Sequence, residues 1–253
     1  MISNILKKSV ELIKKEPILL LPALLFFFLY QTFSQLFDLG LDKNENSFTK
    51  AFLLLIASGW LIELFFKAFT ICFAKQIILK NKSISFKTIM TSLRLYLYDL
   101  VIATGILTIP LFLFFLHIVR RPDSMPIFFL LTVLIGIIVI SLCLPLVPIM
   151  VIFEELSWIK TLHALKKLLI QHWRLLTIFM TLILIFNFFS MIIAEAFNQI
   201  PLLGTSLFKV LIQGISTAFI YILTIFFYLE IKNKENENQS VNIISDDDNI
   251  KDI

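Results

Sequence analysis

Long apolar runs alternate with shorter amphipathic stretches along the chain. Six runs are predominantly apolar, and they cover 17–37, 51–74, 99–119, 126–153, 174–197 and 206–231. Continuous apolar runs of roughly 18 residues or more are typical of membrane-spanning helices. The strands of a membrane barrel would instead alternate apolar and polar residues over about ten positions. The pattern therefore predicts an all-α membrane protein with six transmembrane helices, in one polytopic domain that covers 1–231.

The first, third and fifth runs each follow a stretch in which apolar residues recur at helical spacing. Intervals of three or four residues place such side chains on one face of an α-helix. The three apolar faces consist of Ile2, Leu6, Val10 and Ile13, of Phe86, Ile89, Met90, Leu93 and Leu97, and of Trp158, Leu162, Leu165, Leu169 and Trp173. Basic residues occupy the other sides of these stretches, which is the pattern of a helix that lies in the membrane interface.

The three stretches predict three basic amphipathic interfacial helices. Each lysine or arginine close to an anionic leaflet stabilises membrane association by roughly 1 kcal/mol. The candidates for contact with lipid headgroups are Lys7, Lys8, Lys14, Lys15, Lys87, Arg94, Lys160, Lys166, Lys167 and Arg174. Because each stretch precedes two apolar runs, the sequence also predicts a pseudo-threefold repeat of one interfacial helix and two spans.

Basic residues are distributed unequally between the two sides of the predicted spans. Sixteen of the 22 Lys and Arg residues lie on the side of the N-terminus and five lie on the other side, with Lys67 inside a span. Loops rich in Lys and Arg stay in the cytoplasm, so we expect both termini to be cytoplasmic. The C-terminal segment 232–253 is polar and low in aromatic residues, and we expect it to be disordered.

Composition agrees with the membrane class and points to no cofactor. The chain is 58% hydrophobic, with 27 Phe and a mean hydropathy of +0.92. A soluble domain is usually about 45–50% apolar. Cys72 and Cys143 both lie in apolar runs and have no metal-binding spacing, so we predict neither a disulfide nor a metal site. We likewise predict no cofactor and no nucleic-acid partner.

Two ionisable residues lie near the middle of the second apolar run, Glu63 and Lys67. A charge at the centre of a span costs about 2.5–3.5 kcal/mol, so such residues are candidates for function. The two are four residues apart with the acid first, which is the favourable order for an ion pair along a helix. They either neutralise each other or line a polar cavity. Asn187 and Glu195 in the fifth run are further intramembrane candidates.

The stretch before the fifth run also carries Glu154, Glu155 and His172, which would be the residues of a lipid-modifying enzyme. Adjacent carboxylates point apart on a helix, which weakens that hypothesis. His163 and His172 are nine residues apart and do not form a metal-ligand pair. The chain contains no Gly-rich phosphate loop and no nucleophile motif, so no catalytic residue is assigned.

Two segments resemble a known family. SWIKTLHALKKLLIQHWRLL and FNQIPLLGTSLFKVLIQGISTAFIYILTIFFYLEIK resemble the corresponding parts of YciC-like bacterial inner-membrane proteins, in which Pro201 and Gly204 would form a short outer turn. The layout also resembles the membrane domain of some glycerophosphodiester phosphodiesterases. The resemblance implies a multi-pass protein of the bacterial inner membrane and no reaction. The acidic C-terminal tail goes beyond the pattern of the family.

The sequence favours a non-enzymatic polytopic protein that organises lipids or partner proteins at the cytoplasmic leaflet. Its partners would be anionic membrane lipids and a membrane protein. One alternative is a transporter or channel with a polar site at Glu63 and Lys67. The other is a lipid-headgroup-modifying enzyme, which has the least support because no nucleophile lies beside a base.

Overall fold

The described part of the chain is entirely helical. The computed structural model describes residues 1–40, 45–80, 86–120, 136, 140, 143–198 and 205–248, and these contain seven α-helices, one 3-10 helix and no strands. The elements are α1 (Ile2–Lys15), η1 (Pro17–Leu20), α2 (Leu21–Gly40), α3 (Glu45–Lys80), α4 (Phe86–Arg120), α6 (Val147–Phe153), α7 (Trp158–Asn198) and α8 (Thr205–Asp248). The predicted all-α class is confirmed.

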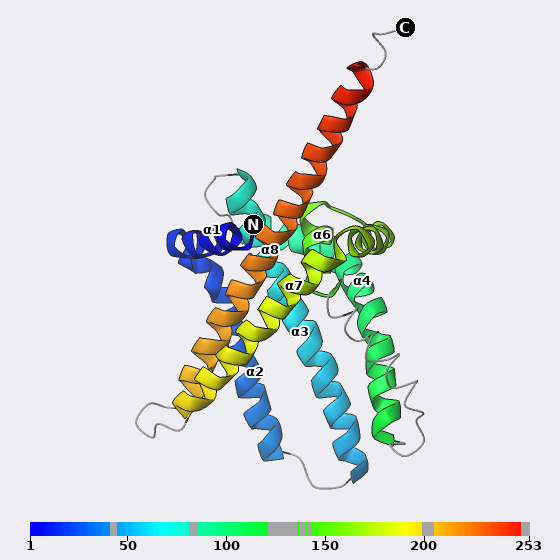
Figure 1. Cartoon of the computed structure of the whole chain (residues 1–253). Coiled ribbons are helices and arrows are strands. Elements are labelled where there is room, and N and C mark those ends of the chain that lie inside the picture. The colour runs from blue at the N-terminus through cyan, green and yellow to red at the C-terminus, as the bar shows by residue number, and fades with distance from the viewer. Residues whose placement is uncertain are drawn as a thin grey trace.

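The helices are arranged as a bundle with two helical segments lying across one end (Figure 1). Helices α2, α3 and α4 run away from that end, and α7 and α8 cross them at a tilt. Helix α1 lies nearly perpendicular to α2 and α3 at this end, and the first part of α7 lies at the same level. The N-terminus lies at this level too, and the last part of α8 projects beyond it.

Helix α6 is buried at the end of the bundle that also carries α1 (Figure 1). All the residues of α6 from Val147 to Ile152 are buried, and α6 packs against α3, α4 and α7. Helix α8 packs against α1, α2, α3 and α7. The rings of Phe179 on α7 and Phe227 on α8 stack with centroids 3.8 Å apart. An apolar core at this end therefore fixes where the two transverse segments lie.

A close approach of backbones joins α2 to α8. Ala218 is fully buried in α8, and Gly214 lies one turn before it. A Cβ atom placed on Gly214 would lie 2.7 Å from Cδ2 of Leu24 and 3.0 Å from its Cα. Only a residue without a side chain lets two helices pack this closely.

Away from the core, apolar side chains face outward. Residues 184–189 and 191–193 of α7 are all exposed, and all but Asn187 are large and apolar. Such a surface is typical of lipid contact. Within the described residues, three stretches are long and apolar enough to cross a membrane: Phe86–Pro110, Trp158–Ala196 and Phe208–Asn236. Pro17–Tyr30 is a shorter apolar helix. The number of six spans stays a prediction.

The junctions between amphipathic and apolar stretches differ from one another. Glu16 separates α1 from η1, and His172 has non-helical φ and ψ angles of −125° and 21° inside α7. The stretch before the third run shows no such break, because α4 continues from Phe86 to Arg120 with Pro110 as its first proline. Two of the three predicted units therefore share an interruption that the third lacks.

Two further segments differ from what the sequence predicts. The end of the fourth apolar run is a turn at residues 144–146 followed by the short helix α6, with Pro148 in its first turn. Most of the preceding residues, 121–135 among them, lie outside the described part of the chain. The segment from 232 was expected to be disordered, whereas α8 continues through Asp248. Residues 232–248 contain no Gly or Pro, and Lys232 and Glu235 pair at 3.7 Å one turn apart.

Candidate functional site

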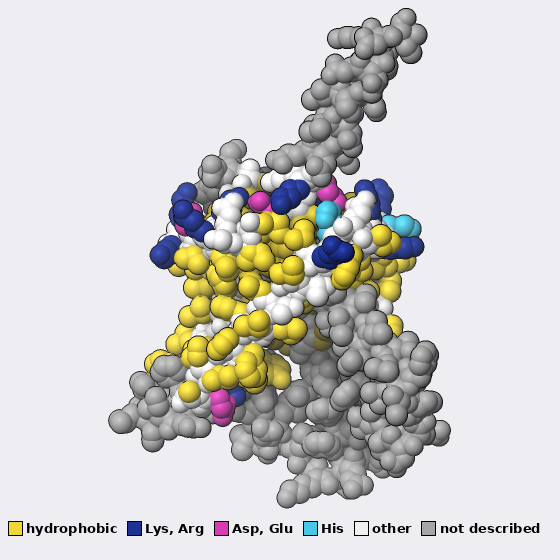
Figure 2. Space-filling model, in the orientation of Figure 1, with side chains coloured by type: hydrophobic (Ala, Val, Ile, Leu, Met, Phe, Trp, Pro, Cys, Tyr) yellow, Lys and Arg dark blue, Asp and Glu magenta, His cyan; other side chains and the backbone are white. Residues whose placement is uncertain are grey.

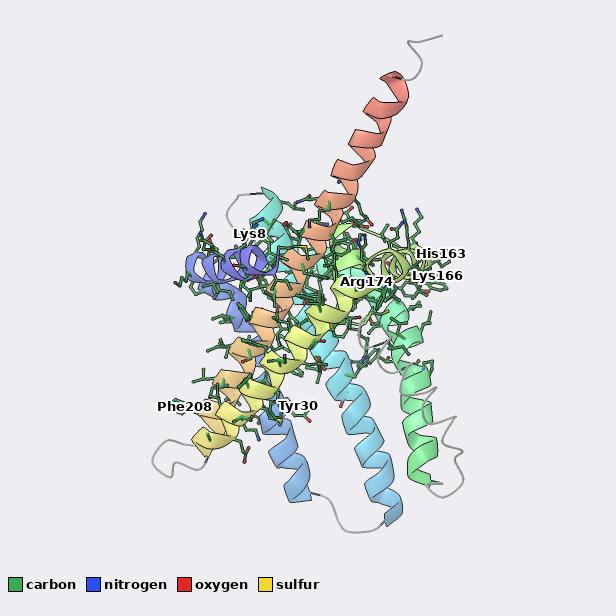
Figure 3. The ribbon with its side chains drawn as sticks, in the orientation of Figure 1. Lys8, Tyr30, His163, Lys166, Arg174 and Phe208 are labelled. Carbon is green, nitrogen blue, oxygen red and sulfur yellow. The ribbon has the colours of Figure 1, made fainter. Side chains whose placement is uncertain are left out.

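Ten exposed basic side chains gather at the end of the bundle that carries the transverse segments. They come from α1, the start of α4 and the first half of α7, and every one of them is exposed. We call them the basic belt: Lys7, Lys8, Lys14, Lys15, Lys87, Arg94, Lys160, Lys166, Lys167 and Arg174. Figure 2 shows Lys and Arg side chains in a band above a largely apolar surface. Lys8, Lys166 and Arg174 lie at this level in Figure 3.

Helix α1 is held against α8 by a stripe next to the predicted apolar face. Ile5 and Ser9 are fully buried, and the Ser9 hydroxyl donates to the carbonyl of Ile5 at 2.9 Å. Val10, on the predicted face, is 40% exposed. Part of the predicted apolar face therefore packs against the protein and part of it is exposed. The lysines project from the other side of the helix.

The first part of α7 has the same three-sided character. Its buried side consists of Thr161, Leu165 and Leu168, whereas Ile159 and Ile170 are apolar and exposed. Lys160, His163, Lys167 and Gln171 are exposed on the polar side of this segment. A helix with one side on protein, one apolar side open and one basic side fits the boundary between lipid tails and headgroups.

The beginning of α7 is fixed by a residue of another helix. Asp99 of α4 accepts a hydrogen bond from the backbone N–H of Trp158 at 2.9 Å. The first N–H groups of a helix have no partner within it, and a carboxylate there also interacts favourably with the helix dipole. Asp99 therefore caps the N-terminus of α7 from a neighbouring helix, and this contact positions the transverse segment. Because Asp99 is 59 positions before Trp158, local sequence patterns do not predict this contact.

Glu154 and Glu155 diverge into two different sets of contacts. The Tyr228 hydroxyl donates a hydrogen bond to Glu154, and Lys232 pairs with the same carboxylate at 3.1 Å. Both partners belong to α8. The adjacent residue, Glu155, has a φ of 57°, a backbone conformation that non-glycine residues seldom adopt. The expectation that the two carboxylates point apart is thus met, though in a turn rather than on a helix.

Glu155 joins the turn to α3 and α4. Lys75 of α3 pairs with its carboxylate at 2.9 Å and also donates to the carbonyl of Ile152. The Lys75 ammonium lies 5.5 Å from the ring centre of Tyr96, whose hydroxyl hydrogen-bonds Glu155. These interactions offset the cost of the unusual backbone angle, which is of order 1–3 kcal/mol.

His172 is part of the same network of ion pairs. Its Nε2 lies 3.2 Å from a carboxylate oxygen of Glu235 on α8. With Glu154 bound to Lys232 and Tyr228, the residues considered for catalysis all make contacts between helices. Within the described residues, no group of three or more His, Cys, Asp or Glu side chains could hold a metal ion. The arrangement holds helices together at the level of the basic belt.

The intramembrane candidates do not converge on one site. Lys67 lies with its ammonium 5.0 Å from the ring centre of Tyr221 on α8, and among the described side chains it forms no ion pair with Glu63. Glu63 lines a cavity instead. On α7, Asn187 is exposed, and Glu195 pairs with Lys209 at 4.0 Å.

Comparisons with protein-family models, with curated proteins and with solved structures find no match to this chain. The resemblance to YciC-like proteins therefore stays a prediction from the sequence. The basic belt and the cavity beside Glu63 are the features of the molecule that bear on its function.

Proposed function

We propose that the protein is a polytopic membrane protein that binds anionic lipid headgroups through the basic belt. The observation that carries this proposal is the exposure of all ten basic side chains at the end where two transverse helical segments lie. A single exposed lysine binds an anionic surface weakly. The free energies contributed by several lysines add, so a group of them binds such a surface more strongly. Lipids bound in this way would be organised around the protein, and a partner protein could be recruited with them.

The packing at the level of the belt supports a scaffold. The ion pairs of Glu154, Glu155 and Glu235 join α3, α7 and α8 at the level of the belt. A framework with these cross-links holds the basic side chains at one level. The headgroup-binding surface would thus be present before any lipid arrives, which lowers the entropic cost of binding.

The belt also supports an orientation. The N-terminus and the end of α8 at Asp248 lie on its side of the molecule (Figure 1). Since regions rich in Lys and Arg stay in the cytoplasm, we place the belt and both termini at the cytoplasmic leaflet. From the resemblance to YciC-like proteins we further propose that the membrane is the bacterial inner membrane.

The proposal is tested by the lipid selectivity of three variants in reconstituted vesicles. Spin-labelled phosphatidylglycerol and phosphatidylcholine report how strongly each lipid associates with the protein. Wild type should prefer the anionic lipid, and the triple change Lys160→Gln, Lys166→Gln, Lys167→Gln should weaken that preference. One lysine contributes about 1 kcal/mol, so each change lowers the relative association constant by about fivefold at most.

A matched control separates position from charge. Lys166→Gln and Lys209→Gln remove the same charge, but Lys209 lies near the start of α8, where it pairs with Glu195. Only Lys166→Gln should lower the selectivity for phosphatidylglycerol. Unchanged selectivity in the triple variant would exclude the basic belt as a lipid-binding surface.

A further inference from the structure

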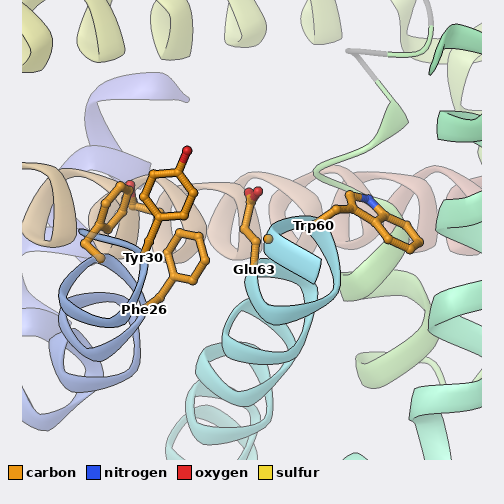
Figure 4. Close-up of a pocket in the computed structure, with 7 residues that line it drawn as sticks. Phe26, Tyr30, Trp60 and Glu63 are labelled. Carbon is orange, nitrogen blue, oxygen red and sulfur yellow. The ribbon is translucent and has the colours of Figure 1, made fainter. Parts of the chain in front are cut away.

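A cavity of about 420 Å³ lies between α2, α3 and α8 (Figure 4). Its lining residues are Phe26, Phe27, Tyr30, Gly59, Trp60, Glu63 and Thr217. Sites for small molecules usually measure about 300–1,000 Å³ and combine apolar walls with a few polar groups. Glu63 precedes Lys75, which contacts the turn at the level of the basic belt, by about three helical turns, or roughly 18 Å along α3. The cavity is therefore well removed from the proposed headgroup surface.

The carboxylate of Glu63 is the ionisable group of this cavity. Among the described side chains, none forms a hydrogen bond or an ion pair with it, and the residue is exposed. Lys67, one turn further along α3, lies over the ring of Tyr221 instead. In Figure 4 the rings of Phe26 and Tyr30 lie on one side of the carboxylate, and the ring of Trp60 points away from it on the other side. The Lys67 ammonium interacts with this carboxylate electrostatically without forming a direct ion pair. An ionisable side chain among apolar helices is costly, so Glu63 is a functional candidate.

Aromatic rings make up most of the remaining wall. Phe26 contacts Phe27 edge to face at 5.0 Å and lies 6.0 Å from Tyr30, so α2 presents a cluster of rings to the cavity. The face of an aromatic ring attracts cations, and rings around a site favour organic ammonium ions. A metal cation would need several oxygen ligands, whereas the lining offers few besides this carboxylate.

We propose that this cavity binds a small organic ammonium ion carrying one positive charge. The Glu63 carboxylate would be the counter-ion, and the rings of Phe26 and Tyr30 would contact the alkyl groups of the cation. A second positive charge is disfavoured because the Lys67 ammonium lies one helical turn away. The site is separate from the basic belt and does not depend on the lipid proposal.

Binding is measured with the full chain in lipid nanodiscs by the fluorescence of Trp60. Trp158→Phe and Trp173→Phe leave Trp60 as the only tryptophan of the chain. Choline chloride is the probe. Its neutral isostere 3,3-dimethyl-1-butanol tests the need for the charge, and sodium chloride tests the effect of ionic strength. A saturable change with choline alone is expected.

Variants test the two kinds of contact. Glu63→Gln should weaken choline binding by about tenfold or more, and Tyr30→Leu should weaken it by about twofold to tenfold. Glu195→Gln removes a carboxylate from another part of the membrane region and should leave binding unchanged. Thermal unfolding of each variant shows that it is folded, and Tyr30→Leu tests the site if Glu63→Gln does not fold.

Nanodiscs of different composition distinguish a free solute from a lipid headgroup. Phosphatidylcholine would compete with choline and raise its apparent Kd if the cavity takes a headgroup, whereas a free solute site would give the same Kd in phosphatidylglycerol discs. Either result supports an ammonium site. No saturable response to choline, an equal response to the neutral isostere, or a folded Glu63→Gln variant that binds like wild type would overturn the proposal.

Discussion

Replacing Gly214 by alanine tests how closely α2 and α8 pack. The added Cβ would lie 2.7 Å from Cδ2 of Leu24 and 3.0 Å from its Cα. The Leu24 side chain can rotate away, but the contact with Cα is relieved only if the two helices move apart. Forcing an extra methyl group into a packed interface costs about 1–3 kcal/mol.

The intrinsic helix preference of alanine stabilises the variant and must be separated from the cost of the steric contact. Alanine is favoured over glycine by up to about 1 kcal/mol inside a helix. Gly105 is a suitable control because, among the described residues, its Cβ would meet only Ile109 Cδ1 at 3.7 Å and Trp60 Cη2 at 4.0 Å, which are ordinary contacts. Gly214→Ala should therefore be less stable than Gly105→Ala by about 1–3 kcal/mol.

Unfolding can be followed through the chain's own cysteines. Cys72 and Cys143 are buried free thiols, so a fluorogenic thiol reagent reacts with them only as the protein opens. Titration with sodium dodecyl sulfate in mixed micelles should give a lower midpoint for Gly214→Ala and an unchanged or higher midpoint for Gly105→Ala. Equal midpoints for the two variants would refute the close approach of α2 and α8.

Three other changes should alter the same unfolding midpoint. Asp99→Ala removes the cap on the N–H of Trp158 and should destabilise by about 0.5–2 kcal/mol, and no change would exclude the capping role. Tyr228→Phe removes the hydrogen bond to Glu154 and should destabilise the protein by about 1.5–3 kcal/mol. The same change should cost less in a Glu154→Gln background, and equal costs in the two backgrounds would exclude energetic coupling between Tyr228 and Glu154. Ser190→Ala removes the 2.7 Å hydrogen bond to Ser216 of α8 and should cost about 0.5–1.5 kcal/mol, and an unchanged midpoint would show that this bond does not stabilise the protein.

Periodicity identified the amphipathic stretches but not their packed sides. All ten predicted headgroup candidates are exposed. On α1, however, the buried residues are Ile5 and Ser9, next to the predicted face of Ile2, Leu6, Val10 and Ile13. A helix at an interface has two apolar neighbours, protein and lipid, and an apolar stripe does not say which part contacts which. Ser9 is polar, so hydrophobic periodicity does not predict that it is buried. It can be buried because its hydroxyl donates a hydrogen bond within its own helix.

The ion pairs at the level of the belt could not be assigned from spacing. Lys75 and Glu155 are 80 positions apart, and their contact depends on how α3 meets the turn before α7. Local spacing did suggest an ion pair between Glu63 and Lys67, but the Lys67 ammonium lies over the ring of Tyr221 on α8. Tertiary neighbours outweigh a helical pair that contributes only about 0.2–0.5 kcal/mol.

The depth of the first part of α7 tests most directly whether the basic belt lies at the lipid headgroups. His163 and Leu184 are both exposed, one beside the belt and one on the apolar surface of α7. Cys72 and Cys143 are replaced, and a nitroxide is attached to a single cysteine at each position in turn. The label at 163 should collide mainly with a water-soluble nickel complex and the label at 184 mainly with oxygen dissolved in the bilayer. Oxygen-dominated collisions at both positions would place the segment inside the hydrocarbon and contradict a headgroup-binding belt.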